Sequence, residues 1–167
     1  MGLDINFYEG TYDGVTDFET KEKTNIISRN SMEAAYFRKN YCLMEWLERY
    51  FNTTIENCEY YIINQKAICN LIDDCNLVID LVEDYNSNRS EDDEYEFPQE
   101  IVEQIVKLFP HNNWNEWDYL QGTWDEEHQR WKREPHKFDW SDYHDICQIR
   151  EVLAPLRASK YVFCADW

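Results

Sequence analysis

The strongest structural signal in this sequence lies in residues 64–82, which read NQKAICNLIDDCNLVIDLV. Apolar side chains recur there at intervals of three and four residues, the spacing of one face of an α-helix. Asn64 is a favourable N-cap residue, because its side-chain oxygen can accept a hydrogen bond from the first turn. The opposite face carries polar side chains such as Lys66 and Asp73. The stretch therefore predicts a core helix whose buried stripe is made by Ile68, Leu71, Ile72, Cys75, Val78, Ile79 and Val82.

Short β-prone segments precede this helix and lie near both ends of the chain. Residues 58–63 (CEYYII) come directly before the helix, and residues 3–8 (LDINFY) alternate between apolar and polar side chains. Residues 160–167 (KYVFCADW) place Tyr161, Phe163 and Ala165 on one side of a strand and Val162, Cys164 and Asp166 on the other, and we expect this strand to pair near the strand at residues 3–8. A weaker strand is predicted over residues 24–28.

Three further helices are predicted from the spacing of apolar residues. The first covers residues 31–51, with Ser31 as its N-cap. Its inward stripe is formed by Tyr36, Asn40, Leu43, Leu47 and Tyr50. The second begins near Pro98, which suits the first turn of a helix, and continues until Pro110. The third spans about residues 141–157 and starts at Ser141.

The order of these elements predicts an α+β fold. With 167 residues and a 43 % hydrophobic share, the chain is long enough to bury roughly 70 % of its unfolded surface in one core. We expect a single compact domain over residues 1–167, with about four helices packed on a small, mostly antiparallel sheet that includes both chain ends. An acidic and tryptophan-rich insertion is expected at about residues 84–140.

The charge of the chain restricts the partners that it can bind. Its 34 acidic and 16 basic residues give a net charge of −18 and a pI near 4.4. Such a surface repels nucleic acid and anionic membranes and attracts basic surfaces. We therefore expect a protein that binds neither nucleic acid nor membrane directly. A cytoplasmic location is expected because no apolar signal region follows Met1 and no stretch approaches the ~18 apolar residues of a membrane span. Two interpretations of the acidity stay open, a functional charged surface and a purely solubilising one.

The six cysteines predict reduced thiols. None of them forms a CxxC motif, which argues against a zinc-ribbon or thioredoxin-like arrangement. We expect Cys69 and Cys75 on one helix and Cys42 on another, all facing apolar neighbours, where cysteine acts as a small hydrophobic residue.

Two neighbouring segments in the second half of the chain are candidates for a partner-binding surface. Residues 83–96 contain seven acidic residues with only Arg89 to offset them, and they predict an exposed loop. Residues 111–140 show no clear period and hold five of the seven tryptophans, a residue type enriched in binding hot spots. A second small aromatic core is the alternative explanation of the tryptophans. The predicted partner-binding residues are Glu91, Asp92, Asp93, Glu94, Trp114, Trp117 and Trp124.

Several blocks of the sequence, taken in order, resemble an uncharacterised family of small phage, prophage and mobile-element proteins. The blocks are MGLDINFY at 1–8, YFRKN at 36–40, MEWL at 44–47, NCEYY at 57–61, LIDDC at 71–75 and YVFCADW at 161–167. The resemblance covers about two thirds of the chain and ceases between residues 84 and 139. It implies a phage-like origin and a compact fold, without an activity. It also implies that the acidic, tryptophan-rich insertion is this protein's own specialisation.

Two weaker patterns suggest a small-molecule ligand or a metal ion. Tyr36, Arg38 and Lys39 form a basic and aromatic cluster that could hold a nucleotide-like anion, although Arg38 could equally pair with a nearby carboxylate. His128, His136 and His144 lie eight residues apart among many acids. Their spacing does not place two ligands on one helical face, so no metal or other cofactor is predicted.

Together these patterns favour a non-enzymatic interaction protein of phage or mobile-element type. It would present an acidic, aromatic surface to a basic host protein, such as a nucleic-acid-binding protein or a defence nuclease, and act as an inhibitor or DNA mimic. A nucleotide-sequestering protein and a metal-dependent enzyme are the two alternatives. The oligomeric state stays open.

Overall fold

The computed structural model describes residues 2–9, 15–17, 23–24, 32–89, 96–110, 122–125, 127, 130–133 and 138–167. The strands are β1 (Asp4–Glu9), β2 (Val15–Asp17), β3 (Lys23–Thr24), β4 (Met32–Arg38), β5 (Tyr60–Asn64), β6 (Gly122–Asp125), β7 (Arg130–Arg133) and β8 (Lys160–Asp166). The helices are α1 (Tyr41–Phe51), α2 (Gln65–Asn88), α3 (Gln99–Leu108) and α5 (Trp140–Leu153).

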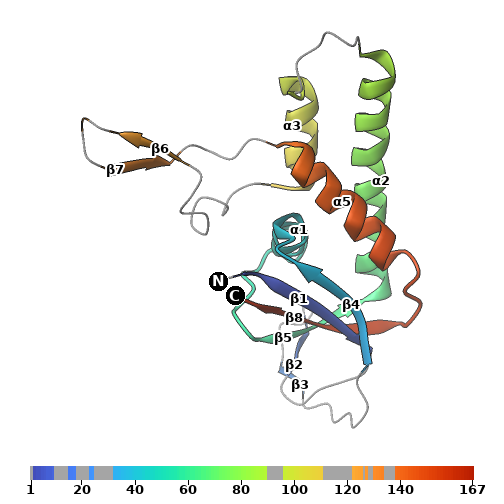
Figure 1. The fold of residues 1–167 in the computed structure, drawn as a ribbon. Helices are drawn as coiled ribbons and strands as arrows, with labels where there is room; N and C mark the ends of the chain where they lie inside the picture. Colours follow the sequence, from blue (N-terminus) through green and yellow to red (C-terminus); the bar gives the residue numbers. More distant parts are fainter. Residues whose placement is uncertain are drawn as a thin grey trace.

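The architecture confirms the predicted α+β class. Within the described ranges, four helices accompany a six-stranded sheet of order β3-β2-β5-β8-β1-β4 and a separate β6–β7 hairpin. The strands β5, β8, β1 and β4 are antiparallel to one another, whereas β2 joins β5 in parallel. Figure 1 shows α1, α2 and α5 on one side of this sheet, with the two chain ends side by side where β1 begins and β8 ends. None of the described helices combines the length and apolarity needed to cross a bilayer.

The central strand β1 connects the two ends of the chain. Its residue Ile5 lies opposite Phe37 of β4 and Ala165 of β8, and Phe7 lies opposite Phe163. All five side chains are buried. The ring of Phe7 meets those of Phe37 and Phe163 edge to face, with centroids 6.0 and 5.3 Å apart, an arrangement that aromatic pairs favour. The predicted pairing of the strands near the two ends of the chain is therefore confirmed.

The first part of the helix predicted over residues 31–51 is wrong, because residues 32–38 form strand β4. Ala35 and Phe37 point into the core, while Tyr36, expected on an inward stripe, is 44 % exposed. A short apolar segment is compatible with the period of a helix or of a strand. Here the hydrogen bonds to β1 make it a strand. The expected N-cap Ser31 lies outside the described residues.

Asn40 is the residue that turns the strand into the helix. Lys39 has a φ of 55°, in the left-handed region, and its N–H bonds to the carbonyl oxygen of Leu3. The fully buried Asn40 then caps α1, because its Oδ1 accepts from the N–H of Leu43 at 3.0 Å. Its Nδ2 donates to the backbone oxygen of Asp145 on α5 at 3.0 Å. Asn40 therefore joins α1 to α5 as well as starting α1.

Helix α2 confirms the predicted core helix and extends it. The Oδ1 of Asn64 accepts from the N–H of Ala67 at 2.8 Å, as expected for the N-cap. The helix continues to Asn88, so the loop predicted over residues 83–96 begins too early. Polar residues sustain this last part, since Ser87 and Asn88 donate to the carbonyl oxygens one turn before them. Residues 90–95 lie outside the described residues.

The remaining predicted boundaries are shifted by local chemistry. Helix α5 is capped by Asp139, which forms a reciprocal capping box with Asp142, and not by Ser141. The helix ends at Leu153, because Pro155 has no N–H to continue the hydrogen-bond ladder. Strand β5 begins two residues later than predicted, since Cys58 has a φ of 59° that a strand cannot accommodate. Of the weak strand predicted over residues 24–28, Thr24 lies in β3 and the rest falls outside the described residues.

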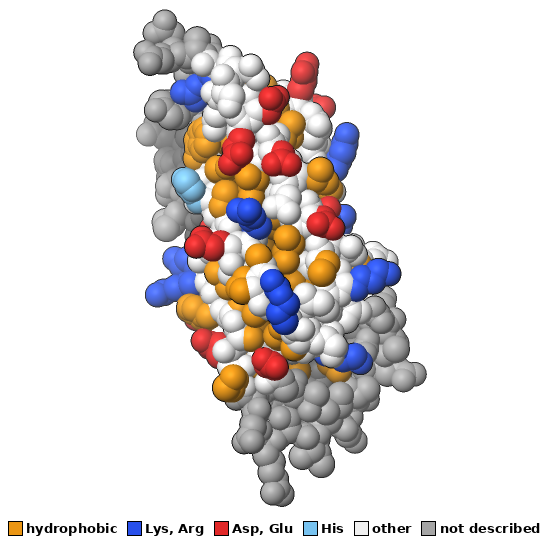
Figure 2. All heavy atoms as spheres, turned by 90° about the vertical axis from the view of Figure 1, so that its right-hand side faces the viewer, with side chains coloured by type: hydrophobic (Ala, Val, Ile, Leu, Met, Phe, Trp, Pro, Cys, Tyr) orange, Lys and Arg blue, Asp and Glu red, His pale blue; other side chains and the backbone are white. Residues whose placement is uncertain are grey.

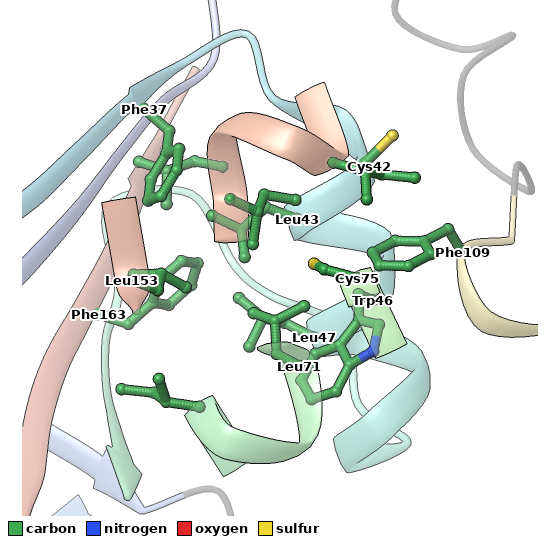
Figure 3. Packing of buried hydrophobic residues seen from close by; sticks show 14 of the residues in the cluster. Phe37, Cys42, Leu43, Trp46, Leu47, Leu71, Cys75, Phe109, Leu153 and Phe163 are labelled. Atoms are coloured by element: carbon green, nitrogen blue, oxygen red, sulfur yellow. The ribbon is translucent and has the colours of Figure 1, made fainter. Parts of the chain in front are cut away.

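One large apolar cluster unites the sheet and all four described helices. Figure 3 shows Phe109, directly after α3, pointing into the cluster that also holds Cys75 and Trp46. Phe97, Ile105 and Phe138 belong to the same cluster. Parts of the stretch expected as an insertion therefore contribute to the main core.

Replacing Asn40 with alanine should lower the free energy of unfolding by about 2–4 kcal/mol, because a helix cap and buried hydrogen bonds are lost together. Urea unfolding followed by circular dichroism measures this loss. Asn64→Ala, at the half-buried cap of α2, is the matched control and should cost about 1 kcal/mol. Equal losses in the two variants would contradict the junction role of Asn40.

Candidate functional site

Most of the predicted partner-binding residues lie outside the described part of the chain. Glu91, Asp92, Asp93, Glu94, Trp114 and Trp117 are in this group. Trp124 is in strand β6, where its backbone lies opposite that of Trp131 on β7. Their role in binding a partner stays a prediction from the sequence.

The predicted anion-binding cluster lies on the edge strand β4 and in the turn after it. Tyr36, Arg38 and Lys39 are exposed, whereas the intervening Phe37 is buried in the core. The hydroxyl of Tyr36 donates to Oδ1 of Asp4 at 2.6 Å, and this hydrogen bond raises the pKa of the tyrosine. A carboxylate in contact with Tyr36 weakens the attraction of this cluster for an anion.

The histidines are not brought together within the described residues. His144 is exposed on α5, and His128 and His136 lie outside the described ranges. In the described part of the chain, no three His, Cys, Asp or Glu side chains lie close enough to hold a metal ion.

The cysteines behave mainly as core residues. Burial raises the pKa of the thiols of Cys42 and Cys75, and it raises that of Cys164 to about 11. These thiols are therefore protonated, and not reactive thiolates, at neutral pH. Cys69 departs from the prediction, because it is exposed on α2, where Gln65 Nε2 lies 3.9 Å from its sulfur. All six cysteines are free.

A groove of about 540 Å³ between α2 and α3 is the feature that the sequence pattern missed. Its α2 wall consists of Leu77, Val78, Leu81 and Asp84. Its α3 wall consists of Gln104, Ile105, Lys107 and Leu108. Val78 and Ile105 are fully buried at the base, whereas Leu77 remains 59 % exposed. We call this feature the α2–α3 groove.

Acidic side chains lie along the α2–α3 groove. Asp80 and Asp84 are exposed on α2 near Leu77, and Glu100 is exposed one turn before Gln104 on α3. Figure 2 views the side of the molecule that carries α2, where apolar side chains form a band; basic side chains lie over the band, and acidic and further basic side chains surround it. The sequence did contain a signal for this surface. Leu77 lies outside the predicted buried stripe of its helix, so an exposed leucine among helical carboxylates could have been expected.

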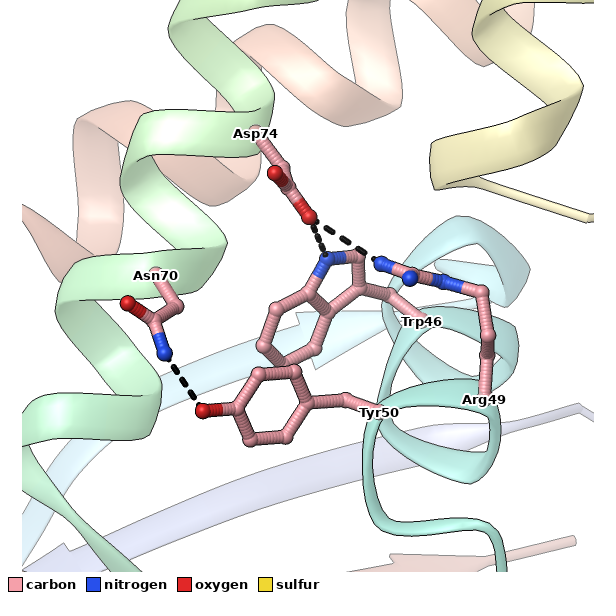
Figure 4. A network of polar contacts seen from close by, with 5 residues as sticks. All are labelled: Trp46, Arg49, Tyr50, Asn70 and Asp74. Atoms are coloured by element: carbon pink, nitrogen blue, oxygen red, sulfur yellow. Dashed lines mark hydrogen bonds and ion pairs between the residues drawn. The ribbon is translucent and has the colours of Figure 1, made fainter.

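A polar network holds α2 in place just before the α2–α3 groove. Oδ2 of Asp74 accepts from the indole Nε1 of Trp46 at 2.7 Å and from Nη2 of Arg49 at 3.0 Å. The guanidinium carbon of Arg49 lies 5.7 Å from the centre of the Trp46 ring. Tyr50 stacks on Trp46 and accepts a hydrogen bond from Asn70 (Figure 4). Because Asp74 is one turn before Leu77, this network fixes the position of the groove wall.

Among the described residues, Asp145 is the carboxyl group whose pKa is shifted most from its ordinary value. Burial raises its pKa to about 6, and the neighbouring carboxylates of Asp142 and Asp139 add to the shift. Perturbed acids often mark active sites. Here the surroundings are structural, since Asp139 and Asp142 form the capping box of α5 and Asn40 binds the backbone of Asp145.

Replacing Asp74 with alanine should lower the free energy of unfolding by about 1–3 kcal/mol, because the buried indole of Trp46 loses its acceptor. Asp74→Asn retains an acceptor oxygen and should cost less. Arg49→Gln removes only a partly exposed ion pair and should stay within about 1 kcal/mol of the wild type. Urea titration of the three variants tests this order, and a larger loss for Arg49→Gln than for Asp74→Ala would contradict it.

Asp145→Asn should stabilise the protein at pH 7 and have little effect near pH 4. The folded state raises the pKa of this carboxyl group, so the protonated form favours folding below pH 4, and that contribution is lost as the pH rises through about 6. Because the group is only part-buried, we expect a gain of about 1–2 kcal/mol at pH 7. Unfolding free energies at both pH values measure it. Asp80→Asn, at an exposed position on α2, is the charge-matched control. An equal gain for Asp145→Asn at both pH values would contradict the raised pKa of Asp145.

Comparison of this chain with family models, curated proteins and solved structures gives no match. The resemblance to small phage and prophage proteins thus stays a prediction carried by the sequence blocks from residues 1–8 to 161–167. The side chains of the described residues are the basis on which a function is assigned.

Proposed function

We propose that this protein is a non-enzymatic interaction protein that binds a basic protein partner. The observation that carries the proposal is the charge of α2 and α3 beside an exposed apolar groove. These helices expose Asp73, Asp80, Glu83, Asp84, Glu100 and Glu103. Lys66 and Lys107 are their only basic residues.

The overall charge favours the same class of partner. A net charge of −18 attracts a basic protein over a distance of about 10 Å at moderate salt and speeds the encounter. Electrostatic complementarity also selects among partners, because juxtaposed like charges oppose binding. A basic protein with an apolar patch fits both properties of the α2–α3 surface.

A host protein that binds nucleic acid, such as a defence nuclease, is the partner that we favour. Between Asp73 and Asp84, α2 exposes four carboxylates over about 17 Å, or about one per 4 Å of helix, while Asp74 is paired with Arg49. Duplex DNA carries one charge per about 1.7 Å, so α2 supplies less than half of that density. A DNA-mimicking inhibitor would therefore need further acids, for which Glu91, Asp92, Asp93 and Glu94 are the nearest in sequence. The phage-like blocks of the sequence are consistent with such a role.

Capture from a nuclease-treated bacterial lysate on the immobilised protein tests this proposal. We expect basic proteins to be enriched and to elute as salt rises from about 50 to 300 mM, because exposed charges are screened over this range. The triple variant Asp80→Asn, Asp84→Asn, Glu100→Gln should capture about fivefold less of the main partner and bind it correspondingly more weakly once purified.

A matched variant separates a specific surface from general acidity. Glu9→Gln, Glu33→Gln and Glu56→Gln together remove the same charge from exposed positions on and beside the sheet. This control should change capture by less than about twofold. Partners that are not basic, or binding indifferent to salt, would refute the proposed function. Equal losses in the two triple variants would show that only net charge matters.

A further inference from the structure

We infer that the α2–α3 groove binds an amphipathic helix of the partner whose apolar side is bordered by lysine or arginine. This inference rests on the proposed function and assigns to it a specific site. It requires a groove of helical dimensions, an apolar base and an acidic border, and the described residues supply all three.

The dimensions of the α2–α3 groove suit a third helix. Two neighbouring helices form its walls, and helices pack by placing side-chain ridges into such grooves. From Leu77 to Asp84 the α2 wall extends over about 10 Å, which is two turns of helix. A bound helix would therefore place apolar side chains at positions i, i+4 and i+7 along the groove.

The apolar part of the groove has a buried base and one largely exposed side chain, Leu77. Val78 and Ile105 are 1 % and 0 % exposed and belong to the main core, so the base is already packed. Leu77 is 59 % exposed and gains burial only when a partner covers it. This exposure also makes the groove an open surface, whereas small-molecule sites enclose most of their ligand.

The charges beside the groove select the occupant. Asp84 lines the groove on α2, and the exposed Asp80 and Glu100 each lie one helical turn before a lining residue, Asp84 on α2 and Gln104 on α3. Lys107 is the basic residue in the groove wall and would pair with an acidic residue of the partner, which fixes the orientation of the bound helix. A second copy of this chain would bring the same acidic border against this one, so the charges oppose self-association through this surface.

Two synthetic peptides of about 18 residues, with the same leucine and lysine content, test the inference. One has its leucines at helical spacing, and the other is a scrambled sequence without an apolar face. Fluorescence anisotropy with labelled peptides should show at least tenfold tighter binding of the helical peptide to the full-length protein. Leu77→Gln should weaken that binding about tenfold, while Met32→Gln, at a 69 % exposed position on β4, should leave it unchanged.

The outcomes separate the groove from the proposed function. Equal binding of the two peptides, or equal binding by the wild type and Leu77→Gln, would contradict helix binding in the α2–α3 groove. A charge-driven interaction would remain compatible with either result. Failure of both peptides to bind would count against the proposed function as well. Thermal unfolding of Leu77→Gln should match that of the wild type, since the side chain is largely exposed, so weaker binding cannot arise from unfolding.

Discussion

The rest of the structure depends on the pairing of β1 with both β4 and β8. This one strand connects residues near the two ends of the chain and presents Ile5 and Phe7 to the helical layer. Phe163 and Phe37 complete the apolar surface on which α1, α2 and α5 pack. Since the paired residues of β1 and β8 are more than 150 positions apart, chain entropy opposes this contact, and the burial of aromatic rings compensates for it.

Helix α2 links this core to the proposed interaction surface. One face of the helix is buried with Leu71 and Cys75, while Leu77 and Asp84 stay accessible on its second half. The hydrogen bond from Trp46 to Asp74 anchors α2 to α1 one turn before the exposed Leu77. A binding surface on a packed helix is preorganised, so little conformational entropy is lost when a partner binds.

The buried base and the exposed side chains of the α2–α3 groove differ in what they contribute to the protein. Its base is shared with the main core, so changes at Val78 or Ile105 would alter stability and recognition together. Leu77 and the bordering carboxylates contribute little to the core and can vary with the partner. Stability therefore resides in the sheet and the helix stripes, whereas the specificity of the proposed interaction would come from exposed side chains of α2 and α3.

The sequence by itself determined the elements whose side-chain pattern is regular. The stripe from Ile68 to Val82 predicted α2, the apolar and polar alternation at residues 3–8 predicted β1, and the β-prone run at residues 160–167 predicted β8. Residues 32–38 (MEAAYFR) do not alternate regularly, and only pairing with β1 made them a strand. Likewise, the exposure of Leu77 beside Ile105 depends on how α3 lies against α2, which is a contact between distant residues that no local pattern encodes.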